Sequence, residues 1–144
     1  MKNLGVKRFI YAQEQDHDIV IRELSKGVKQ SCWMWYTFPQ ICGLGYSPIA
    51  KYYEFTCMGE VRAFAANIFL YSNIVECMET LLELRQTDAI AIFGPIDAQK
   101  LKSSMTVLRT TQQLRGLADA VLDKFFDGEL DNRTIAIIKS MEDR

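Results

Sequence analysis

The sequence predicts a mainly α fold, a compact single-domain bundle of about six to eight helices with an irregular aromatic loop. Three observations favour this fold. Apolar residues recur at steps of three and four across residues 60–85, which is the period of an amphipathic helix. Helix start and stop signals, such as Ser47-Pro48 and Gly27, punctuate the chain. Strand signals are weak, and the one candidate, residues 89–93, is too short to decide between strand and helix.

The N-terminal half is expected to contain several short helices. Residues 9–13 look like one, and Asp16 or Asp18 could cap the next, which Gly27 would end as a C′ residue. After the aromatic loop, Ser47 resembles an N-cap followed by proline at the first helical position. The periodic stretch from residue 60 to residue 85 is one helix, or two if Asn67 or Ser72 divides it.

The C-terminal half reads as further short helices. Thr87-Asp88 could cap a brief helix that ends at Gly94, and Asp97 is well placed to cap the next. A polar connector at residues 110–116 precedes a helix that begins near residue 117 and ends at Gly128. The last helix starts at Asp131 and Thr134. These boundaries lie in one domain, residues 1–144.

Length and composition limit the functional classes. A chain of 144 residues buries roughly 68–70% of its unfolded surface, so it can fold around a core without staples. Its 49% hydrophobic and 24% charged residues exclude disordered and collagen-like classes. A net charge of −1 lacks the basic excess of a typical nucleic-acid binder, which makes that class a weak candidate.

Targeting and metal signals are weak as well. No stretch approaches the ~20 apolar residues of a membrane span, and the N-terminus lacks the apolar run of a signal peptide, so we expect a cytoplasmic protein without membrane association. The cysteines at 32, 42, 57 and 77 form no C-x-x-C pair, and His17 is the only histidine. We therefore expect no metal site, no cofactor and reduced thiols.

Residues 29–45 are the first candidate site. This segment holds both tryptophans, one tyrosine, one phenylalanine, one proline and two glycines, and it follows neither a helical nor a strand period. Aromatic side chains on irregular backbone suit the floor of a ligand pocket. The same cluster could equally be core packing, and both interpretations stay open at this point.

Residues 93–106 are the second candidate site. In a helix, Lys100, Ser103 and Ser104 share a face, where an ammonium group and hydroxyls can donate to phosphate or ribose oxygens. The amides at the start of that helix could add to this. The alternative is a solvated polar face whose hydroxyls bond back to backbone carbonyls.

Four blocks of the sequence together resemble a known family. They are W-M-W at 33–35, F-P-Q at 38–40, G-L-G at 43–45 and K-L-x-S-S-M-T at 100–106. In this order they resemble the bacterial domain-of-unknown-function 1810 family, over about residues 7–138. At superfamily level that family is similar to the NAD- and ADP-ribose-associated domains, small helical proteins thought to cleave a glycosidic bond of ADP-ribose derivatives. The resemblance implies a helical architecture and this ligand class, and it assigns no catalytic residue.

The chain departs from the family pattern at two places. Position 32 is cysteine, where relatives usually carry histidine before the tryptophan, and residues 106–108 read Thr-Val-Leu where relatives have Thr-Leu-Phe. Exchange of histidine for Cys32 removes a proton carrier that works near neutral pH. If that histidine acts chemically in relatives, activity is altered or lost in this chain.

Together these patterns suggest a protein that binds, and as one hypothesis hydrolyses, a phosphorylated ribosyl nucleotide such as an ADP-ribose derivative. Such chemistry needs an aromatic wall, cations for phosphate and a carboxylate. The candidate ligand-binding residues are Lys29, Trp33, Trp35, Tyr36, Gln40, Lys100, Ser103 and Ser104. The weaker catalytic candidates are Asp97, Glu54, Glu14 and Cys32. The alternatives are a non-catalytic ligand-sensing or protein-interaction module and a purely structural or inhibitory protein.

Overall fold

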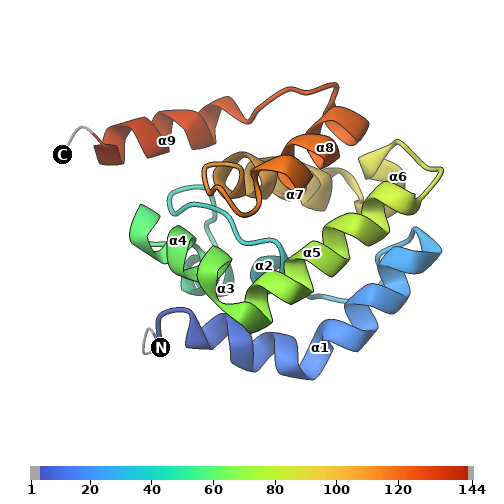
Figure 1. Cartoon of the computed structure of the whole chain (residues 1–144), viewed down its shortest axis with the longest axis horizontal. Coiled ribbons are helices and arrows are strands. Elements are labelled where there is room, and N and C mark those ends of the chain that lie inside the picture. The colour runs from blue at the N-terminus through green and yellow to red at the C-terminus, as the bar shows by residue number, and fades with distance from the viewer. Residues whose placement is uncertain (1–3, 143–144) are drawn as a thin grey trace.

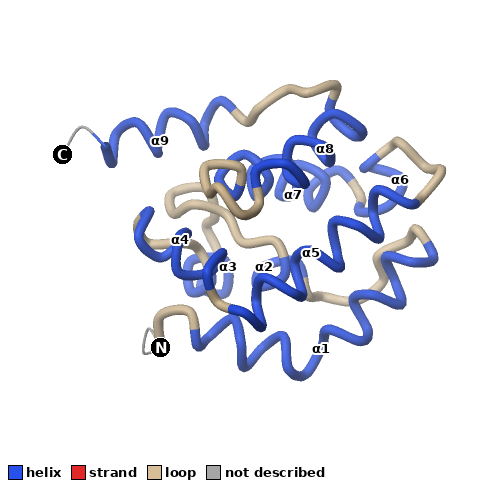
Figure 2. The backbone as a smooth tube through the Cα atoms, in the orientation of Figure 1, coloured by secondary structure: helices blue, strands red, loops and turns tan. Residues whose placement is uncertain are grey.

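Nine helices surround one hydrophobic core in the computed structural model, which describes residues 4–142 (Figure 1). Within these residues the chain forms only helices and loops, as Figure 2 shows, apart from one isolated parallel bridge between Ile41 and Phe55. The predicted all-helical class is confirmed, with more helices than expected. In chain order the helices are α1 (Lys7–Lys26), α2 (Met34–Thr37), α3 (Pro48–Tyr53), α4 (Met58–Ala66), α5 (Ile68–Glu83), α6 (Ala89–Phe93), α7 (Pro95–Leu108), α8 (Arg115–Phe126) and α9 (Asn132–Glu142).

The helices pack around residues 29–45, which we call the aromatic segment. Helix α1 packs against α5, α5 against α8, and α8 against α7. Helix α9 lies along the upper edge of the view in Figure 1, and it contacts α7. The aromatic segment runs through the middle of the molecule, where it forms α2 (Figure 2).

Local capping signals set several helix boundaries as predicted. Helix α1 ends at Lys26, and the next residue, Gly27, has a φ of 75°, the left-handed conformation expected of the glycine that ends a helix. Ser47 caps α3 by accepting a hydrogen bond of 3.2 Å from the amide of Ala50. Asn67 separates α4 from α5, since its side chain accepts from the amide of Leu70 at 3.0 Å.

One predicted boundary is wrong, and one stretch that the sequence left undecided is now assigned. Residues 7–26 form one helix, not two, so neither Asp16 nor Asp18 caps a helix. The carboxylate of Asp16 instead accepts a hydrogen bond from the hydroxyl of Tyr36. Gln13 likewise donates to the backbone oxygen of Tyr36 at 2.7 Å. The undecided residues 89–93 form helix α6, which Asp88 caps through the amide of Ile90 at 2.9 Å.

The C-terminal half contains a further correction. Asp97 is not an N-cap, because α7 already begins at Pro95 after Gly94, whose φ is 80°. Helix α8 begins at Arg115, two positions earlier than predicted. The predicted start of the last helix is confirmed, since the Asp131 carboxylate accepts from the amide of Thr134 at 3.1 Å.

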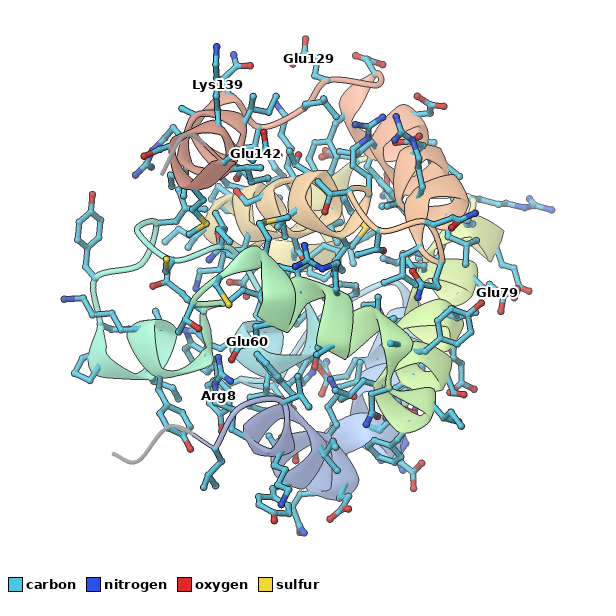
Figure 3. All side chains as sticks on the ribbon, turned by 60° about the vertical axis from the view of Figure 1, so that its left-hand side comes forward. Arg8, Glu60, Glu79, Glu129, Lys139 and Glu142 are labelled. Atoms are coloured by element: carbon cyan, nitrogen blue, oxygen red, sulfur yellow. The ribbon has the colours of Figure 1, made fainter. Side chains whose placement is uncertain are left out.

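A buried ion pair fastens the start of α1 to the rest of the bundle. Arg8 is 2% exposed, and Figure 3 shows its side chain directed from α1 toward Glu60 of α4. The guanidinium donates to both carboxylate oxygens of Glu60 at 2.7 and 3.0 Å. Its remaining hydrogen-bonding capacity is used by the backbone oxygens of Gly5, Tyr52 and Glu54 at 2.5 to 2.8 Å. A buried arginine is tolerated here because each of its donors has a partner.

Candidate functional site

A pocket of about 540 Å³ lies where the end of the aromatic segment, the start of α7 and the start of α9 meet. Its volume is in the range of pockets that hold small organic ligands. Cationic, anionic, amide and hydroxyl side chains all contribute to the lining. The lining residues are Gln40, Leu44, Gly45, Tyr46, Ser47, Ala50, Pro95, Ile96, Gln99, Lys100, Ser103, Asp131 and Arg133.

The first part of the aromatic segment is held in place by one carboxylate of α1. Glu23 is 6% exposed, and its Oε1 accepts from the amides of Gln30 at 2.7 Å and Ser31 at 2.8 Å. The same oxygen accepts from the indole of Trp33 at 2.9 Å, and Oε2 accepts from the hydroxyl of Ser31 at 2.5 Å. Burial alone would raise the pKa of Glu23, but these hydrogen bonds outweigh it and lower the pKa from 4.5 to about 2.

The second part of the segment is positioned by Glu54, which follows α3. Its buried carboxylate accepts from the amides of Gly45 at 2.7 Å and Leu44 at 3.2 Å. Burial raises the pKa of Glu54, and the backbone hydrogen bonds oppose that shift. A Cβ atom on Gly45 would lie 2.6 Å from the Cβ of Ala50, so only glycine allows this approach. These contacts fix the wall of the pocket formed by residues 44–47.

Lys100 brings a positive charge to the pocket from α7. Its ammonium group lies 5.3 Å from the ring centroid of Trp35, within the range of a cation–π contact, and 3.6 Å from Oδ1 of Asp97. These contacts hold the side chain without using all of its donors. Lys29 reaches the same Asp97 at 2.9 Å, so the carboxylate stands between two cations.

Asp131 forms a buried hub at the base of α9. Its Oδ2 accepts from the hydroxyl of Ser103 at 3.1 Å and from both the amide and the hydroxyl of Thr134, at 3.1 and 2.5 Å. Its Oδ1 accepts from the side-chain amide of Gln99 at 3.0 Å. The backbone amide of Asp131 also donates to the hydroxyl of Thr106 at 2.9 Å. This network joins α7 to α9 and places a carboxylate in the pocket.

The mouth of the pocket exposes a second cation and large apolar groups. Among the described residues, no ion pair or hydrogen bond engages the guanidinium of Arg133, which lines the pocket and is exposed. Tyr46 is 84% exposed and Ile96 is 73% exposed, although both line the pocket. The mouth therefore offers a charged group and an aromatic ring that are free to contact a ligand.

The structure brings together some of the residues that the sequence suggested as ligand-binding. Gln40, Lys100 and Ser103 line the pocket, and Trp35 stands beside it in contact with Lys100. The other suggested side chains do not line it. Trp33 and Tyr36 belong to the hydrophobic core, Ser104 is fully buried, and Lys29 donates to the backbone oxygen of Ser31 at 2.6 Å as well as pairing with Asp97.

The suggested catalytic residues occupy four different settings. Asp97 is ion-paired with two lysines, and Glu54 is occupied by backbone amides. Glu14 lies on the exposed side of α1, and Cys32 is exposed on the aromatic segment. None of the four lines the pocket. The carboxylate that does line it is Asp131.

Sequence reasoning missed several pocket residues. Asp131 was recognised only as a helix start, and Arg133, Tyr46 and Gln99 were not singled out. The spacing of Asp131 and Thr134 is an N-cap pattern, which gave no reason to connect it with a helix about 30 residues earlier in the chain. Gln99 lies next to Lys100, and it bonds Asp131 across 32 positions of sequence.

Two further properties of the described residues bear on the chemistry. Within residues 4–142 no cluster of three or more histidine, cysteine, aspartate or glutamate side chains could hold a metal ion. No helix in that range is both long enough and apolar enough to cross a membrane.

Comparison with known proteins places the chain among relatives whose descriptions state no activity. A family model described as "Protein of unknown function (DUF1810)" matches residues 3–138. The crystal structure of the conserved hypothetical protein Rv1873 from Mycobacterium tuberculosis, at 1.38 Å, is 35% identical in sequence. The match covers 96% of this chain and 99% of that one, with a TM-score of 0.91. A comparison with curated proteins finds no match.

Proposed function

Because the chain belongs to the DUF1810 family, which carries no described activity, we propose its function from the pocket: it binds a phosphorylated ribosyl nucleotide, such as an ADP-ribose derivative. The observation that carries this proposal is the convergence of Lys100 and Arg133 on a pocket that also holds the carboxylate of Asp131. A ligand that satisfies all three groups needs an anionic part and hydrogen-bond donors. A phosphorylated sugar has both.

The two cations suit the anionic part of such a ligand. Arg133 can form paired hydrogen bonds to phosphate oxygens, and Lys100 supplies a second, point-like charge. Both side chains keep donors available, since Lys100 is held only by Trp35 and a 3.6 Å contact with Asp97. The exposed ring of Tyr46 can stack on a nucleobase, for which aromatic side chains are the usual platform.

Hydrolysis of the N-glycosidic or ADP-ribosyl bond is a second candidate function. It is favoured by the buried Asp131, because cleavage of a glycosidic bond depends on carboxylates beside the sugar. The competing candidate is a ligand-sensing or protein-interaction module without turnover. The exposure of Tyr46 and Ile96 at the mouth favours that candidate, since a partner protein could cover them.

Calorimetric titration of the purified protein tests the proposal. ADP-ribose, NAD, AMP and inorganic phosphate are titrated separately, and each mixture is then analysed for products. We expect saturable binding of the nucleotides and weaker binding of phosphate alone. Release of a free base or of ribose would establish hydrolysis, and binding without products would favour the sensing module. Absence of binding by every nucleotide to folded protein would refute the proposal.

Variants of one helix give a matched comparison. Lys100→Gln removes the pocket cation, and Lys102→Gln removes a lysine of α7 that pairs with Glu129 at 3.4 Å and does not line the pocket. We expect Lys100→Gln to weaken nucleotide binding by about tenfold, the loss of one charged hydrogen bond. Lys102→Gln should bind like the wild type. Equal affinities for all three proteins would remove Lys100 from the site.

A further inference from the structure

Asp131 presents two chemically different oxygens to its surroundings. Oδ2 accepts from the amide and the hydroxyl of Thr134, and it lies 3.1 Å from the hydroxyl of Ser103, which is also 3.1 Å from the backbone oxygen of Gln99. Ser103 and Thr134 are both buried. Oδ1 has one donor, the side-chain amide of Gln99, which is an exposed residue of the pocket lining. A carboxylate oxygen can accept two hydrogen bonds, so Oδ1 retains one acceptor position. The network thus fixes the carboxylate and leaves one of its oxygens available on the side of Gln99.

The available oxygen requires a donor from the ligand. An ionised carboxylate only accepts hydrogen bonds, so a phosphate placed against Oδ1 would be repelled, whereas a hydroxyl would be bound. The phosphate of a ligand in this pocket is therefore expected near Lys100 and Arg133, and a hydroxyl group near Asp131. Ribose carries such hydroxyls between its phosphate and its base.

We propose that Asp131 determines specificity for the sugar: its Oδ1 accepts a hydrogen bond from a ribose hydroxyl of the nucleotide whose phosphate is bound by Lys100 and Arg133. This inference rests on the proposed function and adds the preference for a ribose over a deoxyribose ligand. A site built to bind a hydroxyl discriminates against an analogue that lacks it, because the second acceptor position of the oxygen then receives no hydrogen bond from the ligand.

The effect of Asp131→Asn follows from the same geometry. The donors of Ser103 and Thr134 hold the oxygen of the new amide in the place of Oδ2. The amide nitrogen then replaces Oδ1, and because it is a donor it cannot accept a hydroxyl hydrogen. This variant should still bind phosphate through Lys100 and Arg133, but it should lose the preference for ribose.

The test compares AMP with 2′-deoxy-AMP and 3′-deoxy-AMP by calorimetry. We expect the wild type to bind AMP about 10- to 100-fold more tightly than at least one deoxy analogue, the range for a hydrogen bond to a charged group. Asp131→Asn should reduce that ratio to near one. Arg133→Gln is the control, because it should weaken the binding of all three ligands equally and leave the ratio of AMP affinity to deoxy-analogue affinity unchanged.

The outcomes separate this inference from the proposed function. Equal affinities of the wild type for AMP and both deoxy analogues would overturn the role of Asp131, while nucleotide binding itself would stand. If no nucleotide binds, ADP-ribose included, both proposals are refuted. The comparison on the wild type decides the matter even if Asp131→Asn does not fold. An Asp131→Asn protein that folds and keeps the wild-type ratio would also overturn the inference.

Discussion

The indole nitrogen of Trp33 donates a hydrogen bond of 2.9 Å to Oε1 of Glu23, and this bond ties the aromatic segment to α1. Both side chains are buried, at 1% and 6% exposure. The carboxylate also accepts from Gln30 and Ser31, so one acidic side chain orders the start of the segment. The segment leads directly to Gln40 and Tyr46 of the pocket. The shape of the candidate site therefore depends on a contact outside it.

Removal of the Glu23 charge should destabilise the protein in a pH-dependent way. The folded-state pKa of about 2 lies below the ordinary value of 4.5, so the ionised carboxylate stabilises the fold above about pH 4.5. This contribution is lost as the pH falls through 2. We expect Glu23→Gln to lower the free energy of unfolding by about 1–3 kcal/mol at pH 7. Denaturant titrations at several pH values should show the difference from wild type shrinking between pH 4.5 and 2. A difference that stays constant over this range would contradict the assigned role.

Breaking the buried pair of Arg8 and Glu60 should be costly. Arg8→Met leaves the Glu60 carboxylate without its main partner and deprives three backbone oxygens of a donor. We expect a loss of about 3–5 kcal/mol in the free energy of unfolding, measured by guanidinium denaturation. Lys102→Met is the control, because its partner Glu129 is exposed and such surface pairs contribute about 1 kcal/mol or less. Similar losses for both variants would show that the Arg8 pair is no more important than a surface pair.

Two glycine substitutions should act in opposite directions. Gly45→Ala places a Cβ 2.6 Å from that of Ala50 and 3.2 Å from a carboxylate oxygen of Glu54. We expect it to destabilise the protein by about 1–3 kcal/mol, as overpacking does, and to weaken nucleotide binding because residues 44–47 must move. Gly116 lies in α8, and a Cβ atom added there would meet no atom within 4 Å. Gly116→Ala should therefore raise the free energy of unfolding by about 0.5 kcal/mol. Thermal melts and AMP titrations of both variants check this, and a neutral Gly45→Ala would mean that the wall is free to move.

Substitution of the two tryptophans should have different effects, one mainly on stability and the other mainly on nucleotide binding. Trp33→Ala truncates a side chain that is 1% exposed and should cost about 3–5 kcal/mol of unfolding free energy. Trp35 is only partly buried and contacts Lys100 through its ring, so Trp35→Ala should cost less stability and instead weaken nucleotide binding. Denaturation and calorimetry on the same two proteins measure both effects. Loss of several kcal/mol with unchanged affinity for Trp35→Ala would assign that residue to the core alone.

Features that depend on neighbouring residues could be predicted from the sequence. Asn67, Ser47 and Gly27 act within one turn of their own position. Ser47 and Gly27 were located correctly as helix boundaries, and Asn67 is the correct one of the two alternatives, Asn67 and Ser72. Asp16 and Asp97 have the same local potential to cap a helix. The carboxylate of Asp16 instead accepts from Tyr36, and that of Asp97 pairs with Lys29, and both partners lie far away in the sequence. Asp97 also pairs with Lys100 on its own helix. A capping pattern cannot reveal such competitors.

The candidate site, like the helix boundaries, could be predicted from the sequence only in part. The helical period places Lys100 and Ser103 on one face, and both line the pocket. The same period groups Ser104 with them, yet Ser104 is fully buried because α7 is covered on that side by the core. Membership of a helix face is a local property, but which residues of the face line the pocket depends on the elements packed against it.

The sequence by itself determined the all-helical class, most helix boundaries and the family, because periodicity, caps and short motifs are encoded within a few residues of one another. Only the tertiary structure decided which polar groups meet. It placed Trp33 in the core and Tyr46 at the mouth of the pocket, and it joined Asp131 to Ser103 across 28 positions of the chain. Burial and hydrogen bonding between distant segments depend on how all the helices pack together, and no local pattern contains that information.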